Sequence, residues 1–148
     1  MNFSLKNISL NLIAAIFIFL FTYTALSKLI EHDLFRNTLN KSPLIGPYAG
    51  IVSIALPITE LIVAGLLFFP KTKLAGLFSS LLLMLLFTGY LSYMILFTKD
   101  LPCSCGGVLQ QLSWQQHLWF NIFFTVLAGL GIYLHLRKRI SFQSSVPV

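Results

Sequence analysis

Charged side chains are scarce in this sequence. Lysine, arginine, aspartate and glutamate make up 9% of the 148 residues, against about 25% in a soluble globular domain. Acidic residues are the rarer kind, because four stand beside ten basic ones and leave a net charge of +6. A chain so poor in charge and so rich in apolar residues is neither an ordinary cytosolic domain nor a disordered tail.

Cysteine is nearly absent as well. The two cysteines, Cys103 and Cys105, are too few for a disulfide-rich secreted module. A metal site is disfavoured as well, because zinc usually takes four ligands and only His117 lies near the two cysteines in sequence. The basic residues are scattered between apolar runs rather than gathered beside polar and aromatic ones, so nucleic acid is not an expected partner.

Hydrophobic residues, by contrast, make up 57% of the chain. They form four runs, at about residues 8–30, 48–69, 74–97 and 114–136, each of 22 to 24 residues. About 20 apolar residues suffice for a helix to cross a bilayer. The first run exceeds the 7–15 residue apolar core of a signal peptide, so we expect it to be retained. The sequence therefore predicts an all-α integral membrane four-helix bundle, with residues 1–148 forming one domain.

The basic residues also predict an orientation. Four spans place both termini on one side, and the flanking positive charges favour the cytoplasm for that side. The predicted cytoplasmic set is Lys6, Lys71, Lys73, Arg137, Lys138 and Arg139, and the outer set is Lys28, Arg36, Lys41 and Lys99. This N-in/C-in arrangement exposes residues 31–47 and 99–113 to the periplasm. Residues 31–39 are expected to continue the first helix, with Leu34, Phe35 and Leu39 on one face.

The cysteines lie in the second outer loop, within Pro102-Cys103-Ser104-Cys105-Gly106-Gly107. Disulfides persist on that side of the membrane. A bridge across one residue is tight, and strained bridges tend to be the oxidising, catalytic ones. Such a short ring also restricts the unfolded chain very little. The pattern thus favours a redox-active dithiol over a static disulfide, unpaired thiols or a metal site.

The fourth span has a recognisable start and a polar face. Ser113 and Gln116 fit a capping box, and Ser113, His117, Asn121 and Thr125 share one face at i, i+4 spacing. Polar groups in a bilayer usually face the bundle interior. His117 is a candidate proton carrier or a partner to a quinone-like ligand, and Asn121 is a candidate cofactor-binding residue. The alternative is that these residues only hydrogen-bond between helices.

Glu60 lies about halfway along the second span, roughly 18 Å deep. An ionisable group at that depth is expensive, which favours a role in proton transfer or ligand contact. The alternative is a single structural hydrogen bond, with Lys28, Tyr23 and Ser27 as candidate partners. Thr88, Ser92 and Tyr93 of the third span are expected to pack between helices. A small transporter built around Glu60 is less favoured, because the chain has no visible repeat or broken helix pair.

Together these features resemble the methylamine-utilisation MauE family and the wider DoxX-like membrane proteins. The resemblance covers about residues 8–136. It rests on four helices, the Tyr23–Lys28 segment, Pro57 with Glu60, and above all Cys103-Ser104-Cys105-Gly106 before the fourth helix. It implies a redox-associated protein of the bacterial inner membrane. It also implies a role in maturing a disulfide-rich periplasmic partner, as in methylamine dehydrogenase small-subunit maturation, and a quinone as candidate cofactor.

The function predicted from the residues and the resemblance is therefore thiol–disulfide exchange through Cys103 and Cys105. The expected partners are the lipid bilayer, a periplasmic thiol or disulfide protein and a membrane partner subunit. His117 would handle protons, and Glu60 and Asn121 would contact a cofactor. The alternative is a non-catalytic membrane chaperone or assembly subunit, in which the cysteine pair is a local clip.

Overall fold

Helices account for nearly all of the computed structural model, which describes residues 3–97 and 113–143. In chain order they are α1 (Phe3–Ile30), α2 (His32–Asn40), the short 3-10 helix η1 (Gly46–Tyr48), α3 (Ala49–Phe68), α4 (Lys73–Phe97) and α5 (Trp114–Gln143). Four segments are long and apolar enough to cross a membrane, namely Asn7–Ile30, Gly46–Phe68, Lys73–Phe97 and Gln115–Arg137. The predicted all-α membrane bundle is thus confirmed.

The first and last long helices extend beyond their apolar runs. α1 begins at Phe3 rather than near Ile8, and α5 continues past Leu136 to Gln143. Neither extension contains the proline or glycine that would interrupt backbone hydrogen bonding. Polar residues therefore end the apolar run in α1 and in α5, but the helix itself continues past them.

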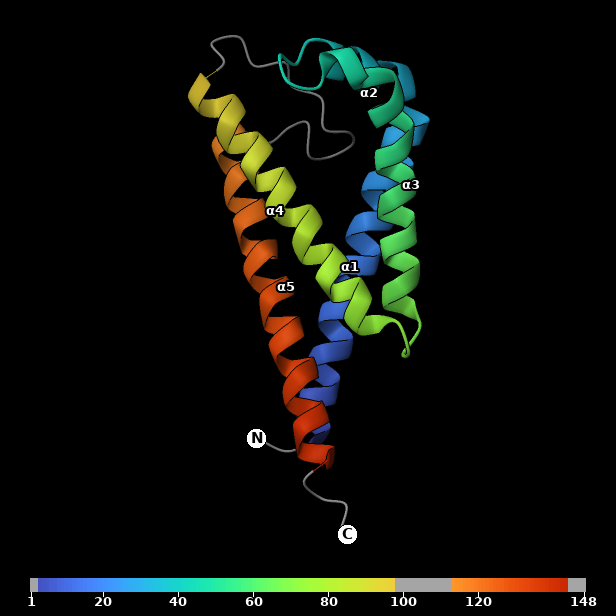
Figure 1. Ribbon diagram of the computed structural model, residues 1–148, viewed down its shortest axis with the longest axis vertical. Coiled ribbons are helices and arrows are strands. Elements are labelled where there is room, and N and C mark those ends of the chain that lie inside the picture. The colour runs from blue at the N-terminus through green and yellow to red at the C-terminus, as the bar shows by residue number, and fades with distance from the viewer. Residues whose placement is uncertain (1–2, 98–112, 144–148) are drawn as a thin grey trace.

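α2 differs from the expected continuation of α1. The backbone turns at Glu31, where ψ is 38°, and a separate helix begins at His32. Phe35 and Leu39 are buried as predicted, but Leu34 is 47% exposed, so its predicted place on the same face is wrong. Phe35 and Leu39 share a face because they are four residues apart. Leu34 is next to Phe35 in sequence and therefore projects from a different side of the helix. α2 lies across the end of the bundle (Figure 1).

The long helices form two pairs (Figure 1). α1 packs along α3, and α4 packs along α5. The pairs lie apart at the end that carries α2, the end of α4 and the start of α5, which we call the α2 end. They converge at the opposite end, which carries the start of α1, the α3–α4 turn and the end of α5, and which we call the terminal end. The Phe17 and Phe124 rings meet edge to face at 5.5 Å and join α1 to α5.

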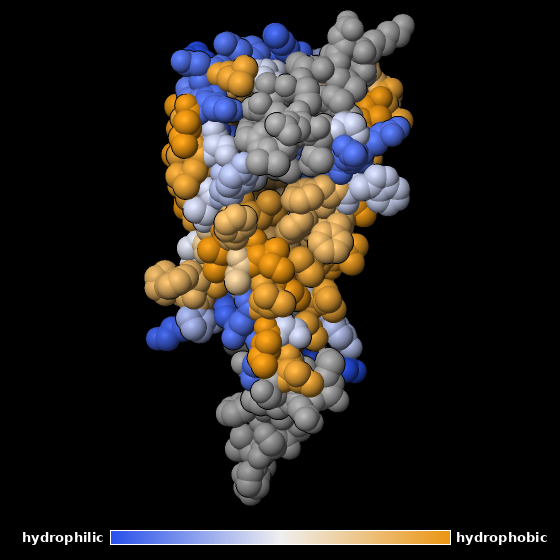
Figure 2. Space-filling model, turned by 180° about the vertical axis from the view of Figure 1, so that it is seen from behind, coloured by the Kyte–Doolittle hydropathy of each residue, from blue (hydrophilic) through white to orange (hydrophobic). Residues whose placement is uncertain are grey.

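The outer surface fits a bilayer. Figure 2 shows an apolar band around the middle of one face, between more hydrophilic regions. Many large apolar side chains in the described ranges are exposed, including Phe19, Ile51, Leu86 and Phe123. In water such a surface would be a liability, whereas lipid tails solvate it. Polar groups can therefore lie on the faces that the two helix pairs turn toward each other, away from the lipid.

Candidate functional site

A cavity of about 370 Å³ lies between the two helix pairs, toward the α2 end. Its size is within the range of pockets that bury small molecules, about 300–1,000 Å³. All five α-helices contribute to its wall. The polar or ionisable side chains of the wall are Thr24, Lys28, Thr38, Glu60, Tyr90, His117 and Asn121, and the apolar ones are Leu20, Phe21, Phe35, Leu39, Ile45, Val52, Leu56, Met84, Leu86, Phe87, Leu91 and Phe120.

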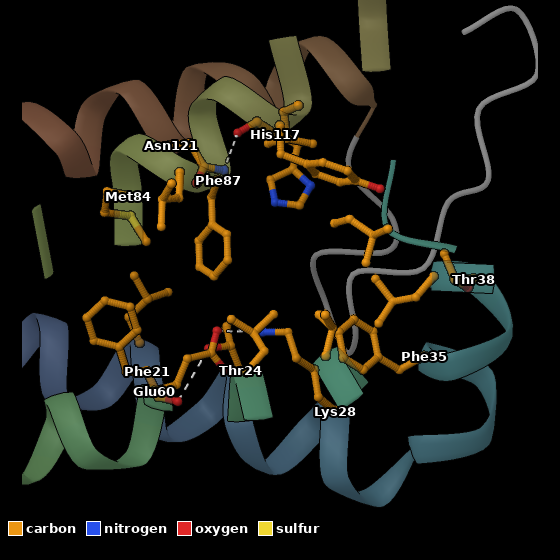
Figure 3. A pocket seen from close by; sticks show the side chains of 18 of the residues that line it. Phe21, Thr24, Lys28, Phe35, Thr38, Glu60, Met84, Phe87, His117 and Asn121 are labelled. Carbon is orange, nitrogen blue, oxygen red and sulfur yellow. Dashed lines mark hydrogen bonds and ion pairs between the residues drawn. The ribbon is translucent and has the colours of Figure 1, made fainter. Parts of the chain in front are cut away.

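An ion pair forms one side of this cavity (Figure 3). The Lys28 Nζ donates a hydrogen bond to Glu60 Oε1 at 2.7 Å, and the two side chains are 8% and 1% exposed. Lys28 also lies 5.9 Å from the ring centroids of Phe35 and Phe87. Glu60 Oε2 has no hydrogen-bond partner among the described residues. Within the described part of the chain, one oxygen of the carboxylate is therefore left as an unused acceptor.

The sequence explains how these two side chains meet. Glu60 is the twelfth residue of α3 and faces α1, while Lys28 stands in the last turn of α1. The difference in depth is bridged because the four-carbon lysine side chain can extend along the helix. α2 covers the pair from the α2 end, where Phe35 packs under the ammonium. Lys28, one of the three partners predicted for Glu60, forms the ion pair with it.

The opposite wall comes from α4 and α5. His117 and Asn121 are buried, at 9% and 4% exposure, and both line the cavity. The His117 ring faces Lys28 across the cavity (Figure 3), close enough for the two to interact electrostatically. The Asn121 amide donates to the His117 backbone carbonyl at 2.9 Å. That bond fixes the orientation of the Asn121 side chain and holds it beside His117.

The start of α5 is capped as predicted. The Gln116 backbone N–H donates to Ser113 Oγ at 3.3 Å, and the Ser113 N–H donates to Gln116 Oε1 at 3.0 Å. This capping box supplies two of the hydrogen bonds that a helix start otherwise lacks. The cap fixes where the first turn of α5 begins, and His117 in that turn lines the cavity.

The other polar residues of the spans have structural roles. Thr125 donates to the Asn121 carbonyl and lies 3.4 Å from Thr88 of α4. Ser92 donates to the Thr88 carbonyl. Tyr93 is exposed, and its ring lies in a tilted arrangement 5.0 Å from that of Phe97 in the same helix. It is not among the cavity residues. The expected packing between helices is therefore observed for Thr88, whereas the hydrogen bond of Ser92 and the ring contact of Tyr93 lie within α4.

Sequence reasoning missed several cavity residues. Thr24, Phe87, Tyr90 and Phe120 line the wall, and nothing in their spacing separates them from ordinary core residues of a membrane helix. It also missed a contact from α2 to α3, in which His32 Nε2 lies 3.2 Å from the buried Ser53 Oγ. Cys103 and Cys105 lie outside the described residues. Within the described ranges no three His, Cys, Asp or Glu side chains gather as metal ligands would.

These features define a multi-pass membrane protein with a buried ion pair in a cavity between its helices. Residues 6–134 match the family described as methylamine utilisation protein MauE. The match covers most of the chain, so this protein belongs to the MauE family, and the predicted resemblance is confirmed. No curated protein and no solved structure matches the chain.

Proposed function

We propose that this chain is a thiol–disulfide redox protein of the bacterial inner membrane, acting on periplasmic proteins through Cys103 and Cys105. One observation carries the proposal. The segment that contains the cysteines joins Phe97 to Ser113, and both of these residues stand at the α2 end, the end nearer the cavity. Membership of the MauE family supports the same function. The role is that of maturing a periplasmic partner, as in methylamine dehydrogenase small-subunit maturation.

The orientation that the proposal needs is N-in/C-in. The α2 end then faces the periplasm, where disulfides persist. The terminal end faces the cytoplasm with Lys71, Lys73 and Arg137. Lys73 supports this grouping, since its Nζ donates to Asn11 of α1 at 2.9 Å and so belongs to the same end as the start of the chain.

The reaction is a disulfide exchange. A thiolate of the partner attacks the Cys103–Cys105 disulfide, which forms a mixed disulfide and releases one cysteine as a thiolate. The partner's second thiolate then displaces the remaining cysteine. The partner gains a disulfide, and the pair gains two electrons and two protons. A quinone or another thiol protein accepts these electrons and protons and restores the disulfide.

The cavity residues assist from within the bundle. His117 carries protons between the cysteine segment and the interior, because imidazole can both accept and donate one. Glu60 and Asn121 contact the cofactor from opposite walls. These roles predict that His117→Gln slows reoxidation of the pair more than its exchange with the partner.

The test is thiol trapping in intact cells. Cells are acid-quenched, the protein is alkylated with a membrane-impermeant maleimide with and without reductant, and the gel shift of the two cysteines is read. We expect a mixture of oxidised and reduced pairs that shifts with the supply of quinone. Cys103→Ser and Cys105→Ser should each abolish partner oxidation, whereas the matched variant Ser104→Ala should retain it.

Two results would overturn the proposal. A pair that stays oxidised under every physiological reductant is a structural clip. Full complementation by both cysteine variants would likewise exclude exchange chemistry. Either result, together with a membrane complex that survives loss of both cysteines, would instead support an assembly subunit.

A further inference from the structure

The Lys28–Glu60 pair presents a donor and an acceptor side by side to the cavity. An ammonium has three N–H groups, and within the described ranges one of them is used, on Glu60 Oε1. Glu60 Oε2 is buried, has no hydrogen-bond partner in residues 3–97 and 113–143, and belongs to a cavity-lining residue. A buried acceptor without a hydrogen bond costs free energy. A ligand that donates a hydrogen bond to this oxygen would recover that cost.

The charges of the wall select a neutral molecule. Lys28 and Glu60 compensate each other at 2.7 Å, and the cavity has no further acidic or basic side chain apart from His117 among its described lining residues. An anion would compete with Glu60 for Lys28, and a cation would compete with Lys28 for Glu60. A neutral ligand with oxygen atoms keeps the pair intact and still uses the spare donor and acceptor.

The remaining residues of the cavity wall favour a ligand with a planar ring. Phe21, Phe35, Phe87 and Phe120 contribute aromatic faces, and the remaining lining is largely aliphatic. Aromatic side chains stack well on planar rings. His117 faces Lys28 from across the cavity (Figure 3), so the site has polar groups at two opposite places and apolar surface between them. A ring with an oxygen at each end matches that arrangement.

We propose that the cavity binds the head group of a lipid-soluble quinone between the Lys28–Glu60 pair and His117. In the oxidised form one carbonyl oxygen accepts a hydrogen bond from Lys28 and the other approaches His117. Two electrons and two protons convert both carbonyls to hydroxyls, and one hydroxyl then donates to Glu60 Oε2. The pair thus suits both redox forms with little movement, because it holds a donor and an acceptor together.

Binding by the cavity does not depend on the cysteines. Its use as the electron acceptor of Cys103 and Cys105 rests on the proposed function. In that use two thiols lose two electrons and two protons and form one disulfide, and one quinone gains them and becomes a quinol. The two ideas can therefore fail separately.

The test is calorimetric titration of the full-length protein in quinone-free lipid nanodiscs. The probe is a ubiquinone with a single isoprene unit, and the matched control ligand is prenylbenzene, which lacks the oxygens. We expect saturable binding of the quinone alone. Lys28→Met combined with Glu60→Leu removes both the donor and the acceptor and leaves no unpaired charge, so binding should weaken by about tenfold or more.

Control variants separate the site from general effects. Lys73→Met removes a lysine that also bonds between helices, to Asn11, but lies outside the cavity, so quinone binding should not change. His117→Gln provides a second test on the opposite wall and should weaken binding by several-fold. Cys103→Ser combined with Cys105→Ser should bind as the wild type does.

Several outcomes would overturn the proposal. They are no saturable binding by the wild type, equal binding of prenylbenzene, and unchanged binding in both cavity variants. The second would mean that the cavity is an apolar lipid pocket. Saturable quinone binding together with a static cysteine pair would leave this proposal standing and remove the proposed function.

Discussion

Among single side chains, the Lys28–Glu60 ion pair dominates the interior. Taking one charge out of water is expensive, and a partner at 2.7 Å offsets that cost while the pair stays complete. Either charge alone would be stranded between apolar helices. Other buried polar groups of the spans are less demanding, since Asn121 and Ser80 bond to carbonyls of their own helices. The pair therefore links the stability of the bundle to the chemistry of the cavity.

Removing one charge of the pair should destabilise the protein more than removing both. We expect Lys28→Met to lower the free energy of unfolding by about 3–5 kcal/mol, because it leaves Glu60 buried without a cation. Lys28→Met combined with Glu60→Leu should recover most of that loss. Reversible unfolding in mixed micelles measures both. Lys73→Met is the control and should change stability by less than about 0.5 kcal/mol. Equal destabilisation of the single and double variants would show that Lys28 and Glu60 are not energetically coupled.

Among the helices, glycine sets how closely neighbours approach. A Cβ added at Gly76 of α4 would lie 2.9 Å from the Leu67 backbone nitrogen of α3. One added at Gly131 of α5 would lie 3.0 Å from Leu77 Cδ2 and 3.2 Å from Ile13 Cγ2. Both contacts fall toward the terminal end. Close glycine contacts there let the helix pairs converge, whereas the cavity lies between the pairs toward the α2 end.

Two glycines of the same helix provide a matched comparison. Gly76→Ala should destabilise the bundle by about 1–3 kcal/mol, because the backbone of Leu67 cannot move aside cheaply. Gly89→Ala meets no atom within 4 Å and should stabilise α4 by up to about 1 kcal/mol through helix propensity. Unfolding of both variants in the same micelles measures the difference. Equal effects would contradict the close packing of α3 on α4.

For the whole molecule, four spans and two chemically different ends determine how it sits in a membrane. The start of α1 and the end of α5 lie together at the terminal end (Figure 1). The α2 end carries Arg36 and Lys41, and the terminal end carries the larger group of basic residues. Positive charge favours the cytoplasm. The orientation of the cysteine segment depends on this balance.

Single introduced cysteines test that orientation. In a Cys103→Ser, Cys105→Ser background, Lys41→Cys should react with an impermeant maleimide in intact cells. Lys71→Cys, in the α3–α4 turn, should react after the cells are opened. Both side chains are exposed in the structure, so accessibility to the reagent reports the side of the membrane. The reverse pattern would place the α2 end in the cytoplasm and contradict the proposed periplasmic chemistry.

Much of this architecture could be predicted from the sequence because the signals are strong and local. Long apolar runs define the spans, and Ser113 with Gln116 defines the start of α5. Glu60 stands out because a charge at that depth is rare. The cavity could not be predicted in the same way. It depends on distant contacts, such as Phe87 near Lys28, and an aromatic residue in an apolar helix looks the same whether it lines a cavity or faces lipid.

The ion pair also bears on how the chain is inserted during synthesis. α3 must leave the translocon carrying Glu60, and an acidic residue at the centre of a helix opposes insertion by roughly 2.5–3.5 kcal/mol. α1 is made earlier, so Lys28 is already in the membrane when Glu60 arrives. α3 is the most apolar of the four candidate spans, which offsets much of that penalty. Insertion and pairing are therefore coupled, and a chain that lacks Lys28 should show poorer integration of α3 even before it has folded.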